Sequence, residues 1–252
     1  MIIRAYAKIN IALKILGKRE DGYHELKSFM QALPDLYDVI EIVESDKTEI
    51  TCSNESLSCG DDNLAAKALK LLGKNAKVHI EKHIPIAAGL AGGSADAAAV
   101  LYAFEGASEK AYNLASKLGA DVPFSLMAIQ FGGKCAAIAR GTGTKLEPCV
   151  RIEGKIVTLT PNLAVSTPEV YGMYDQLTCA STQPGDTDDL TPQEFALNYG
   201  NDLQAPAIKL CPQIQDTLNE LKKPHPVYGA AIKVQQSGSG PTCFAIYKEE
   251  TK

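Results

Sequence analysis

Residues 84–105, IPIAAGLAGGSADAAAVLYAFE, are the most unusual segment of this 252-residue chain. The segment predicts a strand that ends at Pro85 and a glycine-rich turn over 89–93, followed by a helix, because its alanine-rich run has high helix propensity. Ser94 is the expected N-cap of this helix, since a serine hydroxyl can accept a hydrogen bond from a backbone N–H group of the first turn. The segment therefore predicts a strand, a turn and a helix in direct succession.

The glycine turn at 89–93, GLAGG, is suited to binding an anion. Glycines let backbone N–H groups approach a phosphate without an intervening side chain, and the start of the following helix adds about half a positive charge. The residues alone leave a second interpretation open, in which the segment is an ordinary tight turn. The lysine-containing phosphate loop G-x-x-x-x-G-K-[ST] is absent, because Gly132-Gly133-Lys134 is followed by Cys135 and lacks the first glycine.

The N-terminal side of this segment is rich in strand patterns. Residues 2–15 alternate between apolar side chains and a second set that includes Lys8 and Asn10, which predicts a strand with one buried and one polar face. GKREDGYHEL, residues 17–26, is rich in turn formers and predicts a loop or a hairpin connection. Further strands are expected at 36–43, 48–52 and 76–82. Asp61 or Asp62 is the expected cap of a helix over 63–73 that stops at Gly73.

The C-terminal side mixes helices and strands without a simple strand–helix–strand rhythm. The expected elements are a helix over 109–118 between Ser108 and Gly119, a short helix from Pro123, a hairpin within 131–150, a strand over 156–165, helices near 201–222, and strands near 228–234 and 243–247 joined by the turn SGSGPT. Residues 175–193 are poor in apolar side chains and predict a mobile loop or a domain connection. These elements favour an α+β fold over a doubly wound parallel sheet.

The composition excludes several classes of protein. Lys and Arg number 25 against 30 Asp and Glu, and a net charge of −5 is no footprint of binding to nucleic acid or anionic lipid. Apolar residues make up 45% and charged residues 22%, as in a globular rather than a disordered chain. No apolar run approaches the ~18–20 residues of a membrane-spanning helix. Arg4 and Lys8 interrupt the apolar N-terminus, unlike a secretion signal. We expect a soluble, cytoplasmic protein.

Neither the cysteines nor the histidines form a recognisable metal site. The seven cysteines are odd in number, scattered and never in a C-x-x-C pair, which favours reduced thiols. His79 and His83 are four residues apart, but their alternating apolar neighbours predict a strand. On a strand this separation spans about 13 Å, too far for the two rings to share one ion. No residue is therefore assigned to a metal.

Lys8 and Asp121 are the ionisable residues best suited to catalysis. Lys8 lies among apolar neighbours, and Asp121 lies between a helix end and Pro123. A lysine near a carboxylate keeps it ionised and can acidify a substrate hydroxyl. Taken alone, Asp121 is better explained as the cap of the next helix, and the turn at 237–241 as a plain hairpin loop.

Four motifs in this order resemble the GHMP kinase superfamily, and the resemblance covers nearly the whole chain. The motifs are AYAKIN at 5–10, IPIAAGLAGGSADAA at 84–98, GADVPF at 119–124 and SGSGPTCFA at 237–245. The resemblance implies an N-terminal ATP-binding domain over 1–150, similar to the second domain of ribosomal protein S5, and a ferredoxin-like C-terminal domain over 151–252. It implies an active site in the cleft between these two domains.

The resemblance also implies roles for individual residues, with ATP and Mg²⁺ as cofactors. Asp121 is the expected base toward the substrate hydroxyl, with Lys8 beside it. ATP is expected to contact Asn63, Lys82, Pro85, Ala88, Gly89, Leu90, Ala91, Gly92, Gly93 and Ser94. The small-molecule substrate is expected to contact Asn10, Tyr23, His24, Thr167, Tyr171, Gly238, Ser239 and Gly240.

Shorter matches resemble one branch of the superfamily, whose substrate is a cytidine-diphosphate-linked methylerythritol. They are REDGYHEL at 19–26, Asp62-Asn63-Leu64, Glu81-Lys82, Ser166-Thr167-Pro168 with Tyr171, and Asn201-Asp202-Leu203. This branch implies phosphorylation of the 2-hydroxyl in non-mevalonate isoprenoid biosynthesis. It also implies that Tyr23 and Tyr171 stack on the cytosine, while His24 and Lys8 hydrogen-bond its edge or neighbouring backbone. Two hypotheses stay open beside it: another kinase of the superfamily, acting on homoserine, mevalonate or a sugar, and a non-catalytic nucleotide-binding protein. Neither nucleic acid nor membrane is an expected partner, and a monomer or weak homodimer is expected.

The chain departs from the superfamily pattern at Ala87, Ala91 and Ala95, where related sequences have glycine or serine. An extra methyl group costs on the order of 1 kcal/mol where the backbone needs a positive φ. We therefore expect negative φ angles at Ala87 and Ala91. Thr144 also stands where an acidic residue is usual, and the chain is somewhat short, which predicts a trimmed 175–195 region.

Overall fold

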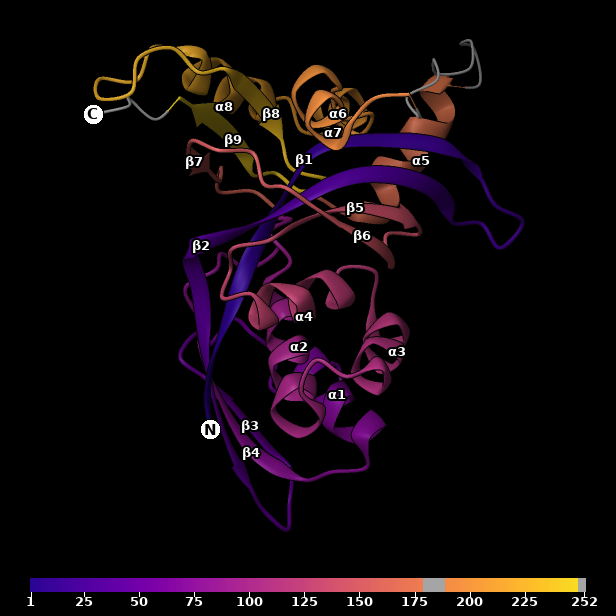
Figure 1. Ribbon diagram of the computed structural model, residues 1–252, viewed down its shortest axis with the longest axis vertical. Helices are drawn as coiled ribbons and strands as arrows, with labels where there is room; N and C mark the ends of the chain where they lie inside the picture. The colour runs from indigo at the N-terminus through magenta and orange to yellow at the C-terminus, as the bar shows by residue number, and fades with distance from the viewer. Residues whose placement is uncertain (179–188, 249–252) are drawn as a thin grey trace.

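The computed structural model describes residues 1–178 and 189–248, which form an N-terminal and a C-terminal half joined by two long strands (Figure 1). The strands are β1 (Ile2–Lys18), β2 (His24–Glu44), β3 (Glu49–Cys52), β4 (Ala76–Glu81), β5 (Ala136–Gly141), β6 (Lys145–Cys149), β7 (Lys155–Leu159), β8 (Lys233–Gln236) and β9 (Cys243–Tyr247). The helices are α1 (Leu64–Leu72), α2 (Gly92–Glu105), α3 (Glu109–Leu118), α4 (Val122–Gln130), α5 (Thr167–Thr178), α6 (Pro192–Asn198), α7 (Gln204–Leu210) and α8 (Gln213–Lys222).

A six-stranded sheet and four helices form the N-terminal half. Strands β3, β4, β2, β5 and β6 lie side by side in that order, and β1 pairs antiparallel with β2. Helices α1 to α4 gather against this sheet (Figure 1). The alanine-rich α2 is buried from Ala95 to Leu101, because its small side chains let it lie close to α1, α3, α4 and β1 at once.

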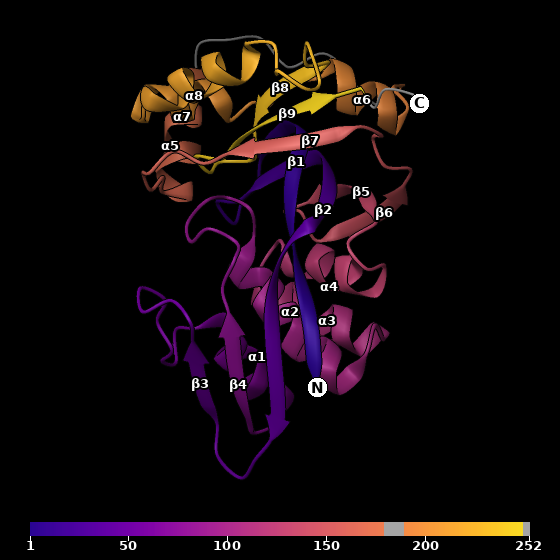
Figure 2. The ribbon, with the colours of Figure 1, turned by 90° about the vertical axis from the view of Figure 1, so that its left-hand side faces the viewer.

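The hairpin of β1 and β2 runs from one half of the molecule into the other (Figure 2). Ile9 and Ile11 of β1 belong to the core of the N-terminal half, whereas Leu13 and Ile15 belong to the C-terminal core. Residues 5–15 of β1 are all buried. The prediction of a polar face over 2–15 is therefore wrong beyond Arg4, because α2, α4 and α6 all pack against this strand.

The C-terminal half is built on a three-stranded antiparallel sheet in the order β7, β9, β8. Its core combines Val170 of α5, Ala207 of α7, Leu218 of α8 and Tyr247 of β9. The turn SGSGPT connects β8 to β9, as the sequence predicts. Mixed helices with mostly antiparallel strands confirm the α+β fold class.

The predicted elements are most accurate where local signals are strong. The helices predicted over 63–73 and 109–118 are present as α1 and α3, and the side chain of Ser108 caps α3. The prediction of Asp61 or Asp62 as the cap of α1 is wrong, because the side chain of Asn63 accepts the capping hydrogen bond from Ala65 N. The strand predicted over 36–43 is present, but it is only the later part of β2, which begins at His24. Most of its early part is buried whichever way the side chain points, so apolar and polar residues do not alternate there. The predicted strand over 156–165 ends at Leu159, and the one near 228–234 lies at 233–236.

The segment over 175–193 is more ordered at its ends than its composition predicts. Helix α5 continues to Thr178, and α6 begins at Pro192 after a capping box made by Thr191 and Glu194. The middle of the predicted loop, residues 179–188, lies outside the described residues.

The next features concern the cysteines, possible metal-binding groups, possible membrane-spanning helices and His79. Six of the seven cysteines lie in the described part of the chain and carry free thiols. Among residues 1–178 and 189–248, no group of three or more His, Cys, Asp or Glu side chains could hold a metal ion. In the same residues, no helix combines the length and apolar character needed to cross a bilayer. His79 lies on strand β4, as its alternating neighbours predict.

Candidate active site

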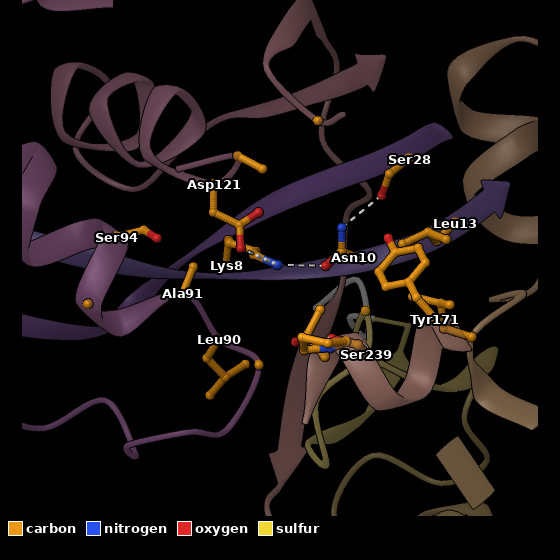
Figure 3. A pocket seen from close by; sticks show the side chains of 18 of the residues that line it. Lys8, Asn10, Leu13, Ser28, Leu90, Ala91, Ser94, Asp121, Tyr171 and Ser239 are labelled. Carbon is orange, nitrogen blue, oxygen red and sulfur yellow. Dashed lines mark hydrogen bonds and ion pairs between the residues drawn. The ribbon is translucent and has the colours of Figure 1, made fainter. Parts of the chain in front are cut away.

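A cavity of about 860 Å³ opens between the helices of the N-terminal half and the start of α5. Its wall includes parts of β1 and β2, the glycine turn before α2, the loop before α4, and the turn between β8 and β9. Figure 3 shows Lys8 and Asp121 between Ala91 and Ser94 on one side and Tyr171 on the other. All four sequence motifs therefore contribute residues to the wall of one cavity, although they lie far apart in the sequence.

Lys8 and Asp121 form an ion pair on the wall of this cavity. The Lys8 Nζ lies 3.3 Å from Asp121 Oδ2, and the lysine side chain is 6% exposed whereas the aspartate is 32% exposed. Lys8 Nζ also donates to Asn10 Oδ1 at 2.7 Å, and Asn10 Nδ2 donates to Ser28 Oγ at 2.8 Å (Figure 3). A buried ammonium group needs this compensation, because desolvation of an unpaired charge is costly.

Asp121 occupies the N-cap position of α4, but its side chain makes no capping hydrogen bond. The interpretation of Asp121 as a cap is therefore wrong. Its carboxylate instead pairs with Lys8 and remains partly exposed to the cavity. A partly exposed carboxylate held next to a buried cation is suited to orient or deprotonate a hydroxyl group.

The glycine turn before α2 is more tightly wound than the sequence predicts. Ala87 and Ala91 both adopt left-handed backbone conformations, with φ of 57° and 62°, so the prediction of negative φ is wrong at both positions. Helix α2 begins at Gly92 with Ala91 at its N-cap, which also makes the prediction of Ser94 as N-cap wrong. The left-handed residue reverses the chain early and starts the helix before Ser94. Ser94 then lies in the first helical turn, where backbone N–H groups have no partner within the helix.

Close packing holds this turn in place and explains its glycines. The N–H of Lys8 donates to the carbonyl of Leu90 at 3.1 Å, which fixes the turn to β1. A Cβ atom at Gly92 would lie 2.9 Å from Lys82 Nζ, and one at Gly89 would lie 2.6 Å from Gly240 Cα. The turn therefore leaves no room for side chains at these two positions, while its residues line the cavity.

Lys82 packs against the glycine turn at Gly92 and forms two buried ion pairs. Its Nζ lies 2.6 Å from Asp38 Oδ2 and 2.8 Å from Asp96 Oδ2, and all three side chains are at most 3% exposed. Asp38 Oδ1 accepts from the N–H groups of His83 and Ile84, which anchors the chain just before the turn. Burial opposes the charge on Lys82, but the two carboxylates outweigh it and raise its pKa. Burial also raises the pKa of Asp96, whose Oδ1 has no hydrogen-bond partner.

The expected ATP contacts divide into two groups. Lys82, Pro85 and the residues from Ala88 to Ser94 line the cavity. Asn63 does not line it, because its amide caps α1 by accepting from Ala65 N at 2.8 Å and donates to Ser58 O at 2.7 Å. Three apolar side chains line this part of the cavity instead, of which only Leu57 lies outside the motifs singled out in the sequence: Leu57, Leu64 and Ile86.

Aromatic and charged side chains form the other end of the cavity. The rings of His24 and Tyr171 stack with centroids 4.9 Å apart, while Tyr23 lines the cavity with 66% of its surface exposed. His24 Nε2 lies 2.7 Å from Asp175 Oδ1, and Lys18 Nζ lies 2.6 Å from Asp175 Oδ2. Burial raises the pKa of the Tyr171 hydroxyl to about 12, and the charge of Asp121 adds to the effect, so the hydroxyl stays protonated.

Sequence reasoning missed Asp175 and Lys18, which both line the cavity. Burial tends to raise the pKa of Asp175, but the hydrogen bonds from Lys18 and His24 outweigh it and lower that pKa. The spacing of Tyr171 and Asp175, one helical turn apart on α5, was the only signal available in the sequence. The bond between Lys18 and Asp175 connects the tip of the β1–β2 hairpin to α5.

The second glycine turn closes the cavity from the C-terminal half. Gly238 and Ser239 line it, and Ser239 Oγ lies 2.7 Å from Thr167 Oγ1 at the start of α5. Gly240 does not line the cavity but packs against the first glycine turn, since a Cβ atom here would lie 2.3 Å from Gly89 Cα. The turn is thus a hairpin loop and a wall of the site at once.

The chain is similar to known proteins over nearly its whole length. The family model described as GHMP kinases N terminal domain matches residues 63–128, and that described as GHMP kinases C terminal matches residues 191–252. A 4-diphosphocytidyl-2-C-methyl-D-erythritol kinase from Clostridium acetobutylicum is 38% identical, over 98% of this chain and 91% of its own length. The same kinase from Thermoanaerobacter pseudethanolicus is 35% identical, over 99% of this chain and 88% of its own.

Solved structures show the same relationship. A crystal structure of 4-(cytidine 5'-diphospho)-2C-methyl-D-erythritol kinase matches with a TM-score of 0.73 and 30% identity, over 98% of this chain and 90% of that one. The mevalonate kinase of Methanococcus jannaschii matches with a TM-score of 0.53 and 18% identity, over 100% of this chain and 92% of that one, a likeness of fold alone.

Proposed function

The chain belongs to the 4-diphosphocytidyl-2-C-methyl-D-erythritol kinase family of the GHMP kinases, and we propose how its cavity performs the reaction. The enzyme is an ATP-dependent small-molecule kinase. It phosphorylates the 2-hydroxyl of 4-diphosphocytidyl-2-C-methyl-D-erythritol, with ADP as the second product, in non-mevalonate isoprenoid precursor biosynthesis. The curated relatives, at 35–38% identity, favour this function over a homoserine or mevalonate kinase. The homoserine kinase and the mevalonate kinase that match in structure are 14% and 18% identical to this chain, a likeness of fold alone.

The observation that carries the mechanism is the Lys8–Asp121 ion pair on the wall between the glycine turn and the aromatic end. Asp121 accepts the proton of the substrate hydroxyl or orients it toward the phosphate. Lys8, paired with that carboxylate at 3.3 Å, lowers the cost of negative charge on the attacking oxygen. Asn10 fixes the direction of the lysine by accepting one of its hydrogen bonds.

The triphosphate of ATP lies against the main chain of the first glycine turn and the start of α2. Gly89 and Gly92 leave no space for side chains there, and the N–H groups of the first helical turn are unpaired within the helix. Leu57, Leu64, Pro85 and Ile86 supply an apolar wall for the adenine. This arrangement binds phosphate without a lysine donated by the loop itself.

Oxygen atoms suited to Mg²⁺ lie on the same wall, at the Asp121 carboxylate and the Ser94 hydroxyl. Mg²⁺ usually binds substrate phosphates and only one or two protein oxygens, so these two residues fit such an ion. When bound, the ion neutralises charge on the transferred phosphoryl group.

The cytidine end of the substrate lies against Tyr23, His24 and Tyr171. The aromatic faces stack on the base, and His24, held by Asp175, presents a ring edge for hydrogen bonding. Gly238, Ser239 and Thr167 contact the part of the substrate between the base and the reacting hydroxyl. A cytoplasmic location and a monomeric or weakly dimeric state remain predictions.

The test measures ADP release with Mg-ATP and, separately, the cytidyl substrate, homoserine and mevalonate. Of the three acceptors, we expect only the cytidyl substrate to be phosphorylated. Asp121→Asn should lower kcat by about 10²-fold or more, with little change in substrate binding, because it removes the base and not the binding surface. Asp216→Asn, an exposed change on α8, is the matched control. Turnover of homoserine or mevalonate, or near-normal kcat in Asp121→Asn, contradicts the proposal.

A further inference from the structure

Asn201-Asp202-Leu203 is a sequence motif to which the mechanism above gives no role. In the structure these residues lie against β1. The N–H of Leu13 donates to Gly200 O at 3.0 Å, and the N–H of Asp202 donates to Leu13 O at 3.0 Å. Asp202 Oδ2 accepts from the N–H of Ile15 at 2.7 Å. The motif is therefore fastened to the same strand that carries Lys8 and Asn10.

The side chain of Asn201 holds the second glycine turn. Its Nδ2 donates to Gly238 O at 2.7 Å and to Gln236 O at 3.0 Å, while its Oδ1 accepts from the N–H of Leu203 at 3.0 Å. The residue is 7% exposed, so water has little access to replace these bonds. A side chain with two N–H donors is needed to satisfy two buried carbonyl groups at once.

The turn held by Asn201 touches both halves of the reaction centre. Its Ser237 Oγ accepts from the N–H of Asn10 at 3.1 Å, and a Cβ atom at Gly238 would lie 2.9 Å from Asn10 Oδ1. That same oxygen accepts from Lys8 Nζ. At its other end, Gly240 packs against Gly89 of the first glycine turn.

We propose that Asn201 is a positioning residue for phosphoryl transfer. By fixing the turn between β8 and β9 to β1, it sets how the acceptor hydroxyl beside Lys8 and Asp121 lies relative to the phosphate on the first glycine turn. This inference rests on the proposed function. Its effect follows from the sensitivity of such transfers to alignment, in which a displacement of about 1 Å can cost about 10²-fold in rate.

The test replaces Asn201 with a side chain of the same shape that lacks the two donors. Asn201→Asp keeps the acceptor for Leu203 N–H but places an oxygen against two carbonyl oxygens. We expect kcat to fall about 10- to 10²-fold, while the dissociation constant of the cytidyl substrate, measured without ATP, changes less than about threefold. The reason is that the cytosine of the substrate is held at the aromatic end of the cavity, away from this turn.

The pH profile separates positioning from simple loss of structure. A protonated carboxyl group regains one O–H donor, so the deficit of Asn201→Asp should shrink as pH falls, whereas that of Asn201→Ala should not. Asn201→Ala also covers the case in which the buried carboxylate prevents folding. Asn219→Asp, the same change on the exposed face of α8, should keep wild-type kinetics.

Three outcomes overturn the inference. They are kcat within twofold of wild type in a folded Asn201 variant, a lower melting temperature with unchanged kinetics, and equal pH dependence in the two Asn201 variants. Failure of the wild-type enzyme to phosphorylate the cytidyl substrate would instead refute the proposed function, so the two failures are distinguishable.

Discussion

The two ends of the cavity are built in different ways. At the phosphate end, the surface is main chain, with glycines in close contact and a fully buried Asp38–Lys82–Asp96 cluster beneath it. At the cytidine end, the surface is made of side chains, in which the partly exposed Asp175 and Lys18 and the buried His24 are joined by the His24–Asp175 and Lys18–Asp175 bonds. The phosphate end therefore depends on backbone geometry and buried charge, and the cytidine end on side-chain orientation.

The contact between Gly240 and Gly89 offers the strongest test of the main-chain end. A methyl group in Gly240→Ala would lie 2.3 Å from Gly89 Cα and must push the two glycine turns apart. We expect kcat/KM to fall about 10²-fold or more, roughly 2.7 kcal/mol, measured by steady-state kinetics on protein that melts cooperatively.

Gly17→Ala is the control for this experiment, because nothing lies within 4 Å of a Cβ atom at Gly17. A folded Gly240→Ala enzyme with wild-type kinetics would show that close contact between the turns is not required.

The buried cluster beneath the first turn should make stability depend on pH. Burial raises the pKa of Asp96 in the folded state above the value of about 3.9 expected for an unfolded chain. At pH values between the unfolded pKa and the raised folded pKa, Asp96 holds a proton in the folded protein that it has lost in the unfolded chain. Its contribution to the free energy of unfolding is therefore greatest below pH 4 and falls as the pH rises. Asp96→Asn should remove this decline, which urea titrations across pH 4–8 measure as the slope of the unfolding free energy against pH.

Asp175→Asn offers a matched comparison for Asp96→Asn, since it makes the same change at the lowered pKa of Asp175. Because the pKa of Asp175 is lowered, its contribution to stability is lost only as the pH falls below about 4, so the slope of Asp175→Asn across pH 4–8 should stay close to that of the wild type. An unchanged slope in Asp96→Asn would contradict the assignment.

The cytidine end should respond in substrate affinity rather than in stability. Asp175→Asn retains an acceptor for His24 but loses the charge that pairs with Lys18. We expect KM for the cytidyl substrate to rise about tenfold while KM for ATP changes less than about twofold. Exposed ion pairs contribute at most about 1 kcal/mol to folding, so the melting temperature should hardly move. An equal rise in both KM values would show that the two ends are not separate.

The alanines in the first glycine turn should give the smallest effect. Ala91→Gly removes a methyl group at a φ of 62° and should stabilise the protein by about 0.5–1 kcal/mol. Ala95→Gly, the same change inside α2, should destabilise it by about 1 kcal/mol. Thermal melts of the pair check the sign, and two shifts in the same direction would contradict this account of the turn.

The motif residues were predictable because each motif is a short run with its own chemistry. Lys8, Asp121 and Gly238 could be singled out from their neighbours and from the resemblance of the four motifs to one superfamily. The early part of β2 was missed because a strand buried on both faces lacks alternation. The contact between Asp175 and Lys18 was missed because 157 residues separate them in the sequence.

Local signals in the sequence determined the helices α1 and α3 and the glycine turns, since those signals act over a few residues. The family of the chain followed from the resemblance of four motifs taken together. Long-range packing decided the left-handed Ala87 and Ala91, the ion pair that turns Asp121 away from capping, and the contact of Gly240 with Gly89. These features depend on which surfaces meet, and a pattern along the chain carries no information on the space left between two backbones.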